Sequence, residues 1–219
     1  PTTEVYLHSK THLSGAPMRT NTSPNEVDRK PNMTITLELA ENVVQAVGFA
    51  DIAGLPLNRH VTVSWQHAQC VGRVQDIQGK FLERFSKWVR YHGVTPAYVW
   101  AIENGRVLGY HSHILCHVPP PLFRSFKRMV LKWIDGEPDQ SGPVKTTMIT
   151  SIKYGYGKNR LNRIKGVTRY LLKSADEETS SLLAITPRPD KAGMVRGKRV
   201  GTSQNLGRGS RATNQFSTM

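Results

Sequence analysis

Cysteine and long apolar runs are scarce in this sequence of 219 residues. Its two cysteines, Cys70 and Cys116, cannot build a disulfide framework and form no Cys-x-x-Cys pair, which fits a reducing compartment and argues against a structural zinc site. The longest apolar runs, such as residues 182–185, fall far short of the roughly 20 apolar residues that span a bilayer. The first residues also lack the charged and apolar regions of a secretory signal. We therefore expect a cytoplasmic protein without membrane contact.

Acidic residues are few compared with basic ones. The chain has 30 lysines and arginines against 16 aspartates and glutamates, a net charge of +14 and a pI near 10.1. Such an excess favours a polyanionic partner, because binding releases that partner's counterions, although a solvated basic surface has the same composition. The charge is concentrated, since residues 153–176 hold seven basic side chains and one acidic one. The candidates for phosphate contact are Lys153, Lys158, Arg160, Arg163, Lys165 and Arg169.

The apolar pattern predicts one α+β domain between two less regular ends. We expect residues 1–33 to form a flexible leader and residues 186–219, rich in Gly, Arg and Ser, to form a basic tail that is ordered only in part. Residues 34–185 are predicted to fold around a central antiparallel sheet, with helices mainly on one face and beside it. The predicted strands are 59–65, 97–103, 108–118 and 144–152, and the predicted helices are 81–93, 123–136 and 161–173. Residues 33–47 fit a strand giving way to a helix, which the pattern leaves open.

Two histidines lie on the second strand of a predicted hairpin, whose turn is Asn-Gly. Because side chains alternate along a strand, His111 and His113 share one face, about 6.6 Å apart along the chain, while Ser112 points to the other. The hairpin returns Glu103 to the neighbouring strand, where its carboxylate can complete a set of two imidazoles and one carboxylate. Paired histidines are more often surface or packing residues, and the glutamate favours a metal site without deciding it. His117, further along that face, is expected to be structural or to support a ligand.

A tyrosine and a lysine share one face of the last predicted helix. Tyr170 and Lys173 are three residues apart and project together, with Arg163 near the same face. A helical tyrosine normally lies at the edge of a core, but this one has a basic setting. A phenol is almost wholly protonated at neutral pH, so a tyrosine nucleophile benefits from a nearby cation. Tyr154 and Tyr156 are rival nucleophiles, on a glycine-interrupted loop that offers no helical platform.

Together these motifs resemble the HUH endonuclease superfamily, and within it the rolling-circle replication initiators of plasmids, phages and small single-stranded DNA viruses. The matching residues are Glu103, His-Ser-His at 111–113 and Tyr-Leu-Leu-Lys at 170–173. Val-Thr-Val-Ser-Trp at 61–65 matches the family's first strand motif loosely. The histidines precede the tyrosine, as in these initiators and unlike most conjugative relaxases. The resemblance spans about residues 59–176.

The resemblance implies a site-specific nickase of single-stranded DNA. A divalent metal, Mn²⁺ or Mg²⁺, held by Glu103, His111 and His113, would polarise the scissile phosphate. Tyr170 would attack that phosphate and leave a 5′-phosphotyrosine and a free 3′-OH that primes replication. Lys173 would stabilise the phenolate or orient the phosphate.

The resemblance also implies partners for the chain. Residues 34–185 would form the HUH endonuclease domain, and the six basic candidates above would contact single-stranded or hairpin DNA at a replication origin, in a bacterial cell carrying a plasmid or phage. The chain has no Gly-x-x-x-x-Gly-Lys-Ser/Thr motif, so helicase and polymerase would come from the host.

The match departs from the family at Ser112, where the family usually has an apolar residue. The second tyrosine that two-tyrosine initiators carry one helical turn later is absent after Tyr170. Other functions also stay open. A single-tyrosine transposase or a mobilisation protein would use the same chemistry. A non-enzymatic α+β module that binds single-stranded nucleic acid would explain the charge alone.

Overall fold

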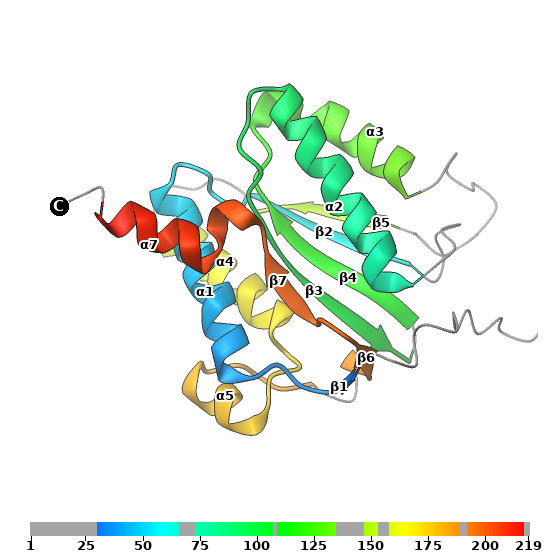
Figure 1. The fold of residues 1–219 in the computed structure, drawn as a ribbon, viewed down its shortest axis with the longest axis vertical. Coiled ribbons are helices and arrows are strands. Elements are labelled where there is room, and N and C mark those ends of the chain that lie inside the picture. Colours follow the sequence, from blue (N-terminus) through cyan, green and yellow to red (C-terminus); the bar gives the residue numbers. More distant parts are fainter. Residues whose placement is uncertain are drawn as a thin grey trace, which may run out of the picture.

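The computed structural model describes residues 30–65, 73–106, 109–134, 147–152, 158–188 and 192–216. A five-stranded antiparallel sheet in the order β5-β2-β4-β3-β7 forms the centre, and β1 and β6 pair as a second, two-stranded sheet (Figure 1). The predicted α+β class is confirmed. The strands are β1 (Pro31–Asn32), β2 (Arg59–Ser64), β3 (Tyr98–Gly105), β4 (Gly109–Cys116), β5 (Thr147–Ser151), β6 (Val195–Arg196) and β7 (Val200–Thr202). The α-helices are α1 (Leu37–Ile52), α2 (Val74–Tyr91), α3 (Phe123–Trp133), α4 (Lys158–Leu171), α5 (Glu177–Leu182) and α7 (Arg208–Phe216), and short 3₁₀ turns are η2 (Pro120–Leu122) and η3 (Gln204–Leu206).

The predicted hairpin is the middle of the sheet. Strands β3 and β4 pair in a register that sets Glu103 directly opposite His111. Strand β4 also pairs with β2, so that its backbone is hydrogen-bonded on both edges. A slip of β4 by one residue would turn His111 and His113 toward the apolar core under α2 and α3 and would bring Ser112 to the other face. The hairpin therefore holds the histidine face in a fixed place.

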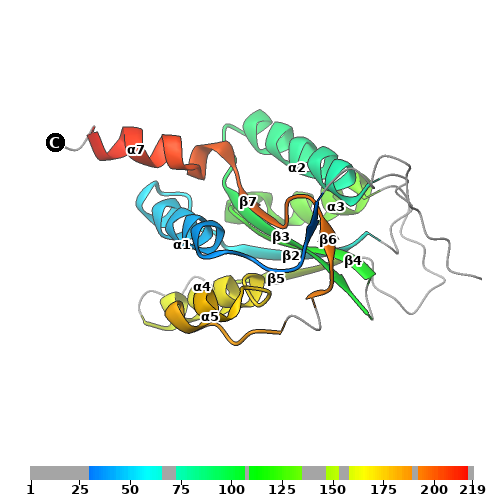
Figure 2. The same cartoon turned by 60° about the horizontal axis from the view of Figure 1, so that its bottom comes forward.

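Helices cover both faces of the sheet, and the prediction that they lie mainly on one face is wrong in this detail (Figure 2). Ile102 and Ile114 pack with α2 and α3 in one core, whereas Val99 and Leu115 pack with α1 and α4 in a second core. Neighbouring positions of β3 and β4 are thus apolar on both sides, and strands of this kind need cover on both faces. The second core carries the tyrosine helix α4 to the face of the histidines.

The C-terminal segment belongs to the domain, so the predicted domain boundary at residue 185 is wrong. Strand β7 pairs with β3 and closes one edge of the sheet. Before it, the fully buried guanidinium of Arg199 donates hydrogen bonds to the carbonyl oxygens of Asn32 (2.8 Å), Ala192 (3.4 Å) and Gly193. One arginine thus joins the two ends of the described chain. The apolar pattern does not predict this segment as part of the domain, because its buried apolar residues, such as Val195, Val200 and Leu206, are scattered and a buried cation adds to their packing.

The structure bears in part on the predicted leader and on the expected absence of membrane contact. Most of the predicted leader, residues 1–29, lies outside the described residues, while β1 pairs with β6. Of the helices described, none combines the length and the apolar character needed to cross a membrane.

Candidate active site

Three potential metal ligands converge on the face of the sheet that lies under α4. Glu103 projects from β3, and His111 and His113 project from β4. Nε2 of His111 lies 3.1 Å, and Nε2 of His113 3.8 Å, from Oε2 of Glu103. The ligand atoms all lie within 4.8 Å of one another, and the three side chains are buried. This group could hold a metal ion.

Hydrogen bonds on the far side of each imidazole turn Nε2 toward the shared centre. The Nδ1 atom of His111 lies 2.8 Å from the Gly109 carbonyl oxygen, which only accepts, so Nδ1 carries the proton. The Nδ1 atom of His113 lies 3.1 Å from the Thr62 hydroxyl, and its Nε2 is buried without a hydrogen-bond partner in the described part of the chain. Metal-binding histidines are commonly oriented in this way. A cation placed between these atoms would contact both Nε2 nitrogens and Oε2 of Glu103 at once.

A third histidine, His60 on β2, belongs to the site and was not predicted. Its Nε2 lies 3.3 Å from Nδ1 of His113, and the two ring centroids are 5.3 Å apart. Burial, with a further contribution from the charge of Lys173, lowers the pKa of His60 to about 4. Burial first, then Lys173, also lowers the pKa of His113 well below its ordinary value. Both rings are therefore neutral at pH 7, which is the form of imidazole that binds metals.

The predicted lysine reaches the metal-ligand group itself. The Lys173 ammonium lies 2.7 Å from Oε1 of Glu103, the oxygen that does not face the histidines. Both side chains are almost fully buried, with 6% and 1% of their areas exposed. The same ammonium lies 3.7 Å from the centroid of the Tyr170 ring. Lys173 thus bridges the carboxylate and the tyrosine, in a cation–π contact on one side and an ion pair on the other.

The predicted tyrosine lies beside the histidines and is open to solvent. The Tyr170 ring centroid is 4.9 Å from that of His113, and 41% of the residue is exposed. Helix α4 holds it there because Ile164 and Leu171 are buried in the core below. One turn earlier, a Cβ at the exposed Gly166 would have no described atom within 4 Å, so no described side chain covers this turn of the helix.

The structure separates the basic candidates on α4 from one another. Arg163 is exposed, seven residues before Tyr170 on the same helical face. Arg160 forms a two-pronged ion pair with Asp51 of α1, with distances of 3.0 and 2.5 Å. Lys165 and Arg169 line an apolar groove of about 320 Å³ between α1 and α4, which is a different side of α4. The remaining candidates, the side chain of Lys158 together with Lys153, Tyr154 and Tyr156, lie outside the described residues.

Ser112, on β4, and His117, just after it, form hydrogen bonds away from the metal-ligand group. Ser112 points to the opposite face, as its place in the strand predicts, and its hydroxyl bonds with Trp65 and Gln78. His117 bonds through Nδ1 to the Pro56 carbonyl oxygen at 2.9 Å and is not part of the metal-ligand group.

Sequence reasoning missed two contributions to this site. Alternation along the predicted strand 59–65 puts His60 on the face of Thr62, but only the pairing of β2 with β4 brings that face beside His113. The second is the C-terminal segment, in which Gly193 packs against the residue after Glu103. A Cβ at this glycine would lie 1.8 Å from the Asn104 carbonyl oxygen, and the Asn104 amide donates to the Met194 carbonyl at 3.2 Å.

Comparison of the sequence with models of known protein families finds no match, and comparison with curated proteins finds no similar sequence.

Proposed function

We propose that this protein is a metal-dependent DNA nickase of the HUH type, which starts rolling-circle replication through a 5′-phosphotyrosine intermediate. The observation that carries the proposal is the position of an accessible tyrosine, Tyr170, 4.9 Å in ring-centroid distance from His113, one of the metal-ligand candidates. In this proposal one phosphate group contacts the nucleophile, the cation and the buried ammonium. Two imidazoles and one carboxylate suit a divalent ion such as Mn²⁺ and tolerate Mg²⁺ at cellular concentrations.

The proposed reaction exchanges one phosphodiester for another. The Tyr170 hydroxyl oxygen forms a bond to the scissile phosphorus, the bond from phosphorus to O3′ breaks, the phenolic proton leaves and O3′ takes up a proton. A bound divalent ion would supply Lewis-acid polarisation of the phosphate oxygens. Because a phosphodiester is conserved in the phosphotyrosine, the same residues can rejoin strands without a nucleotide cofactor.

The surrounding side chains have separate tasks in this proposal. His111 and His113, with Glu103, would hold the ion, while the Thr62 hydroxyl, 3.1 Å from Nδ1 of His113, would help to orient that ring. Lys173, 3.7 Å from the tyrosine ring centroid, would stabilise negative charge as the phenol loses its proton. Arg163, exposed on the tyrosine face of α4, would contact the DNA backbone. Host polymerase would extend the free 3′-OH while host helicase separates the strands.

Trapping the covalent intermediate tests the proposal. The full chain is incubated with a randomised pool of single-stranded and hairpin oligonucleotides and Mn²⁺, and adducts are identified by denaturing gel and by mass spectrometry of peptides. We expect an adduct on Tyr170, its loss in Tyr170→Phe with DNA binding retained, and its loss in EDTA. Tyr91→Phe is the matched control, since Tyr91 is 85% exposed at the end of α2, on the other face of the sheet.

Two results would contradict the proposal. An adduct that persists in Tyr170→Phe would contradict the assignment of Tyr170 as the nucleophile. An equal yield of adduct in EDTA would contradict the role of a metal ion. Binding without any adduct across the pool would favour the single-strand-binding module. If adducts form, the sequences recovered separate a replication origin from the ends of a transposon or a mobilisation site.

A further inference from the structure

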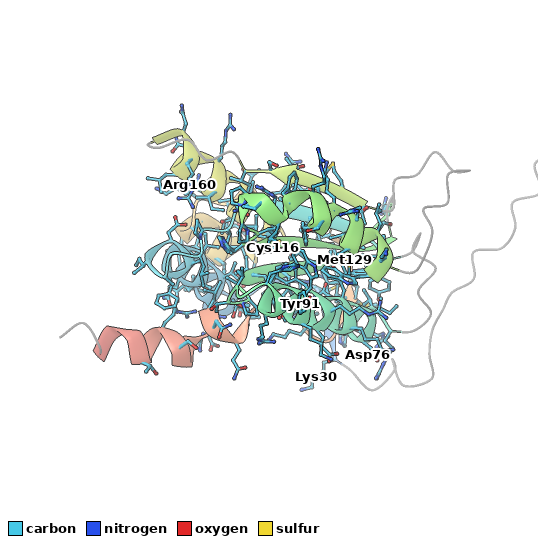
Figure 3. All side chains as sticks on the ribbon, turned by 90° about the horizontal axis from the view of Figure 1, so that it is seen from above. Lys30, Asp76, Tyr91, Cys116, Met129 and Arg160 are labelled. Atoms are coloured by element: carbon cyan, nitrogen blue, oxygen red, sulfur yellow. The ribbon has the colours of Figure 1, made fainter. Side chains whose placement is uncertain are left out.

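The outer layer formed by α2 and α3 carries positive charge that the proposed nickase site does not use. The two helices together hold eight lysines and arginines against two carboxylates, a net charge of +6. This layer covers the face of the sheet opposite to the tyrosine helix α4 (Figure 2). Figure 3 views the molecule from the side of α2 and α3, with Tyr91 and Met129 as landmarks. The charge of the chain is therefore divided between two faces.

Four cations of α3 form a single stripe. Arg124, Lys127, Arg128 and Lys132 are all exposed, at a spacing that places them on one side of the helix, and α3 has no acidic residue. The opposite side of the helix is buried in the core. The stripe covers about 12 Å of helix, at about 1.5 Å per residue. Within the described part of the chain, no ion pair joins any of the four to a carboxylate.

We propose that this stripe, the α3 stripe, binds the backbone of double-stranded DNA next to the nicked strand. A stripe of about 12 Å spans three or four phosphates of one strand, which rise about 3.4 Å each along the duplex. Proteins that hold single strands add aromatic side chains on which bases stack. Within α2 and α3, both described in full, the large apolar side chains that are exposed are Tyr91, at the end of α2, and Leu131. On α3 itself, which is described in full, no aromatic side chain is exposed, so the stripe offers charge without a stacking platform, which suits a paired backbone.

Further contacts connect this stripe with the edge of the sheet near the site. The Arg59 guanidinium, on β2, lies 4.0 Å from the Phe123 ring centroid, and the Lys127 ammonium lies 5.2 Å from it. The adjacent edge strand β5 carries Met148, which is 54% exposed and pairs with Thr62, so it lies on the histidine face. In this proposal a strand that separates from a duplex on α3 passes around β5 to reach the tyrosine. The inference rests on the proposed function only in taking DNA as the polyanion.

A salt titration of DNA binding tests the role of the α3 stripe. The triple variant Arg124→Gln, Lys127→Gln, Arg128→Gln is compared with Lys30→Gln, Arg188→Gln, Lys198→Gln, which removes the same charge from exposed sites outside α2 and α3. Fluorescence anisotropy measures the binding of a hairpin with a duplex arm and of an unpaired strand of equal length. For the hairpin, we expect the slope of log affinity against log salt to fall by about 2.7 in the stripe variant, or about 0.9 per lost phosphate contact. The unpaired strand and the control variant should keep the parental slope.

The outcomes separate this inference from the proposed function. A stripe variant that binds the hairpin like the control variant overturns the inference, as does an equal loss on both DNA forms, which would mean an unselective basic surface. Adduct formation on Tyr170 is scored in the same samples. If adducts form but the stripe variant has no effect, the nickase proposal stands and the duplex-binding inference fails. If the stripe variant has its effect but no adducts form, the duplex-binding inference stands and the nickase proposal fails.

Discussion

Replacing Lys173 by methionine should make the metal-ligand group bind cations more tightly and make the metal-free protein less stable. The variant keeps the length and apolar stem of the side chain and removes an ammonium that lies 2.7 Å from Oε1 of Glu103. Because Glu103 is 1% exposed, water screens this charge little. The lysine satisfies the carboxylate when no cation is bound, and it opposes a cation that arrives.

The size of the effect follows from Coulomb's law. A dication about 5 Å from the ammonium is repelled by about 7 kcal/mol at an effective dielectric constant of about 20. Relaxation and water entry reduce this value, yet a fifth of it, about 1.4 kcal/mol, still changes a dissociation constant tenfold. We therefore expect Mn²⁺ to bind Lys173→Met at least tenfold more tightly. Without metal, a lone buried carboxylate should lower the free energy of unfolding by about 3–5 kcal/mol.

Calorimetric titration with Mn²⁺ measures the affinity, and urea unfolding in EDTA measures the stability. Lys165→Met is the control, because Lys165 is an exposed lysine on the same helix, on the side that faces the groove. Equal or weaker Mn²⁺ binding by Lys173→Met would refute the electrostatic argument. The reasoning also requires that a phosphate anion strengthen Mn²⁺ binding by the parental protein more than by the variant, since the anion offsets the ammonium.

Three more substitutions probe the surroundings of the site and the fold. Thr62→Val removes the partner that orients the second histidine and should weaken Mn²⁺ binding by about 10- to 100-fold in calorimetry. Gly193→Ala, at a φ of +57° and against the Asn104 carbonyl, should cost about 1–3 kcal/mol of unfolding free energy in urea. Asp176→Ala removes the N-cap of α5 and should cost about 1 kcal/mol at pH 7. Hydrogen bonds from Thr179 lower the pKa of Asp176. The ionised cap therefore stabilises the folded protein fully above the ordinary aspartate pKa, and this stabilisation is lost as the pH falls through the lowered pKa. Below that pH, parent and variant should be equally stable.

Matched controls keep these results specific. Thr150→Val changes an exposed threonine on β5, two residues after Met148, the residue that pairs with Thr62. This variant should bind Mn²⁺ with the parental affinity. Gly48→Ala adds a methyl group in α1 where no atom lies within 4 Å, and should stabilise the helix slightly. Unchanged Mn²⁺ affinity in Thr62→Val, or unchanged stability in Gly193→Ala, would contradict the contacts described. A stability difference for Asp176→Ala that persists in acid would mean that its carboxylate does not act as the cap.

The sequence alone determined the parts of the site that depend on local periodicity. Alternation along one strand put His111 and His113 together, and the turn of one hairpin brought Glu103 opposite them. Helical spacing put Tyr170 and Lys173 on one face. These relations involve neighbours in the chain, whose geometry the backbone fixes before any tertiary contact forms.

Only the tertiary structure decided which side chains meet across larger separations. That α4 packs on the histidine face and that Lys173 pairs with Glu103 depend on which helix covers which side of a sheet that is apolar on both. That His60 adjoins His113 depends on the pairing of β2 with β4. The sequence does not predict strand β7, because three residues are too few to show an alternating apolar pattern. This segment becomes a strand only through its pairing with β3. Net charge is likewise visible in composition, but its division between α4 and the α3 stripe arises only when the helices take opposite faces of the sheet.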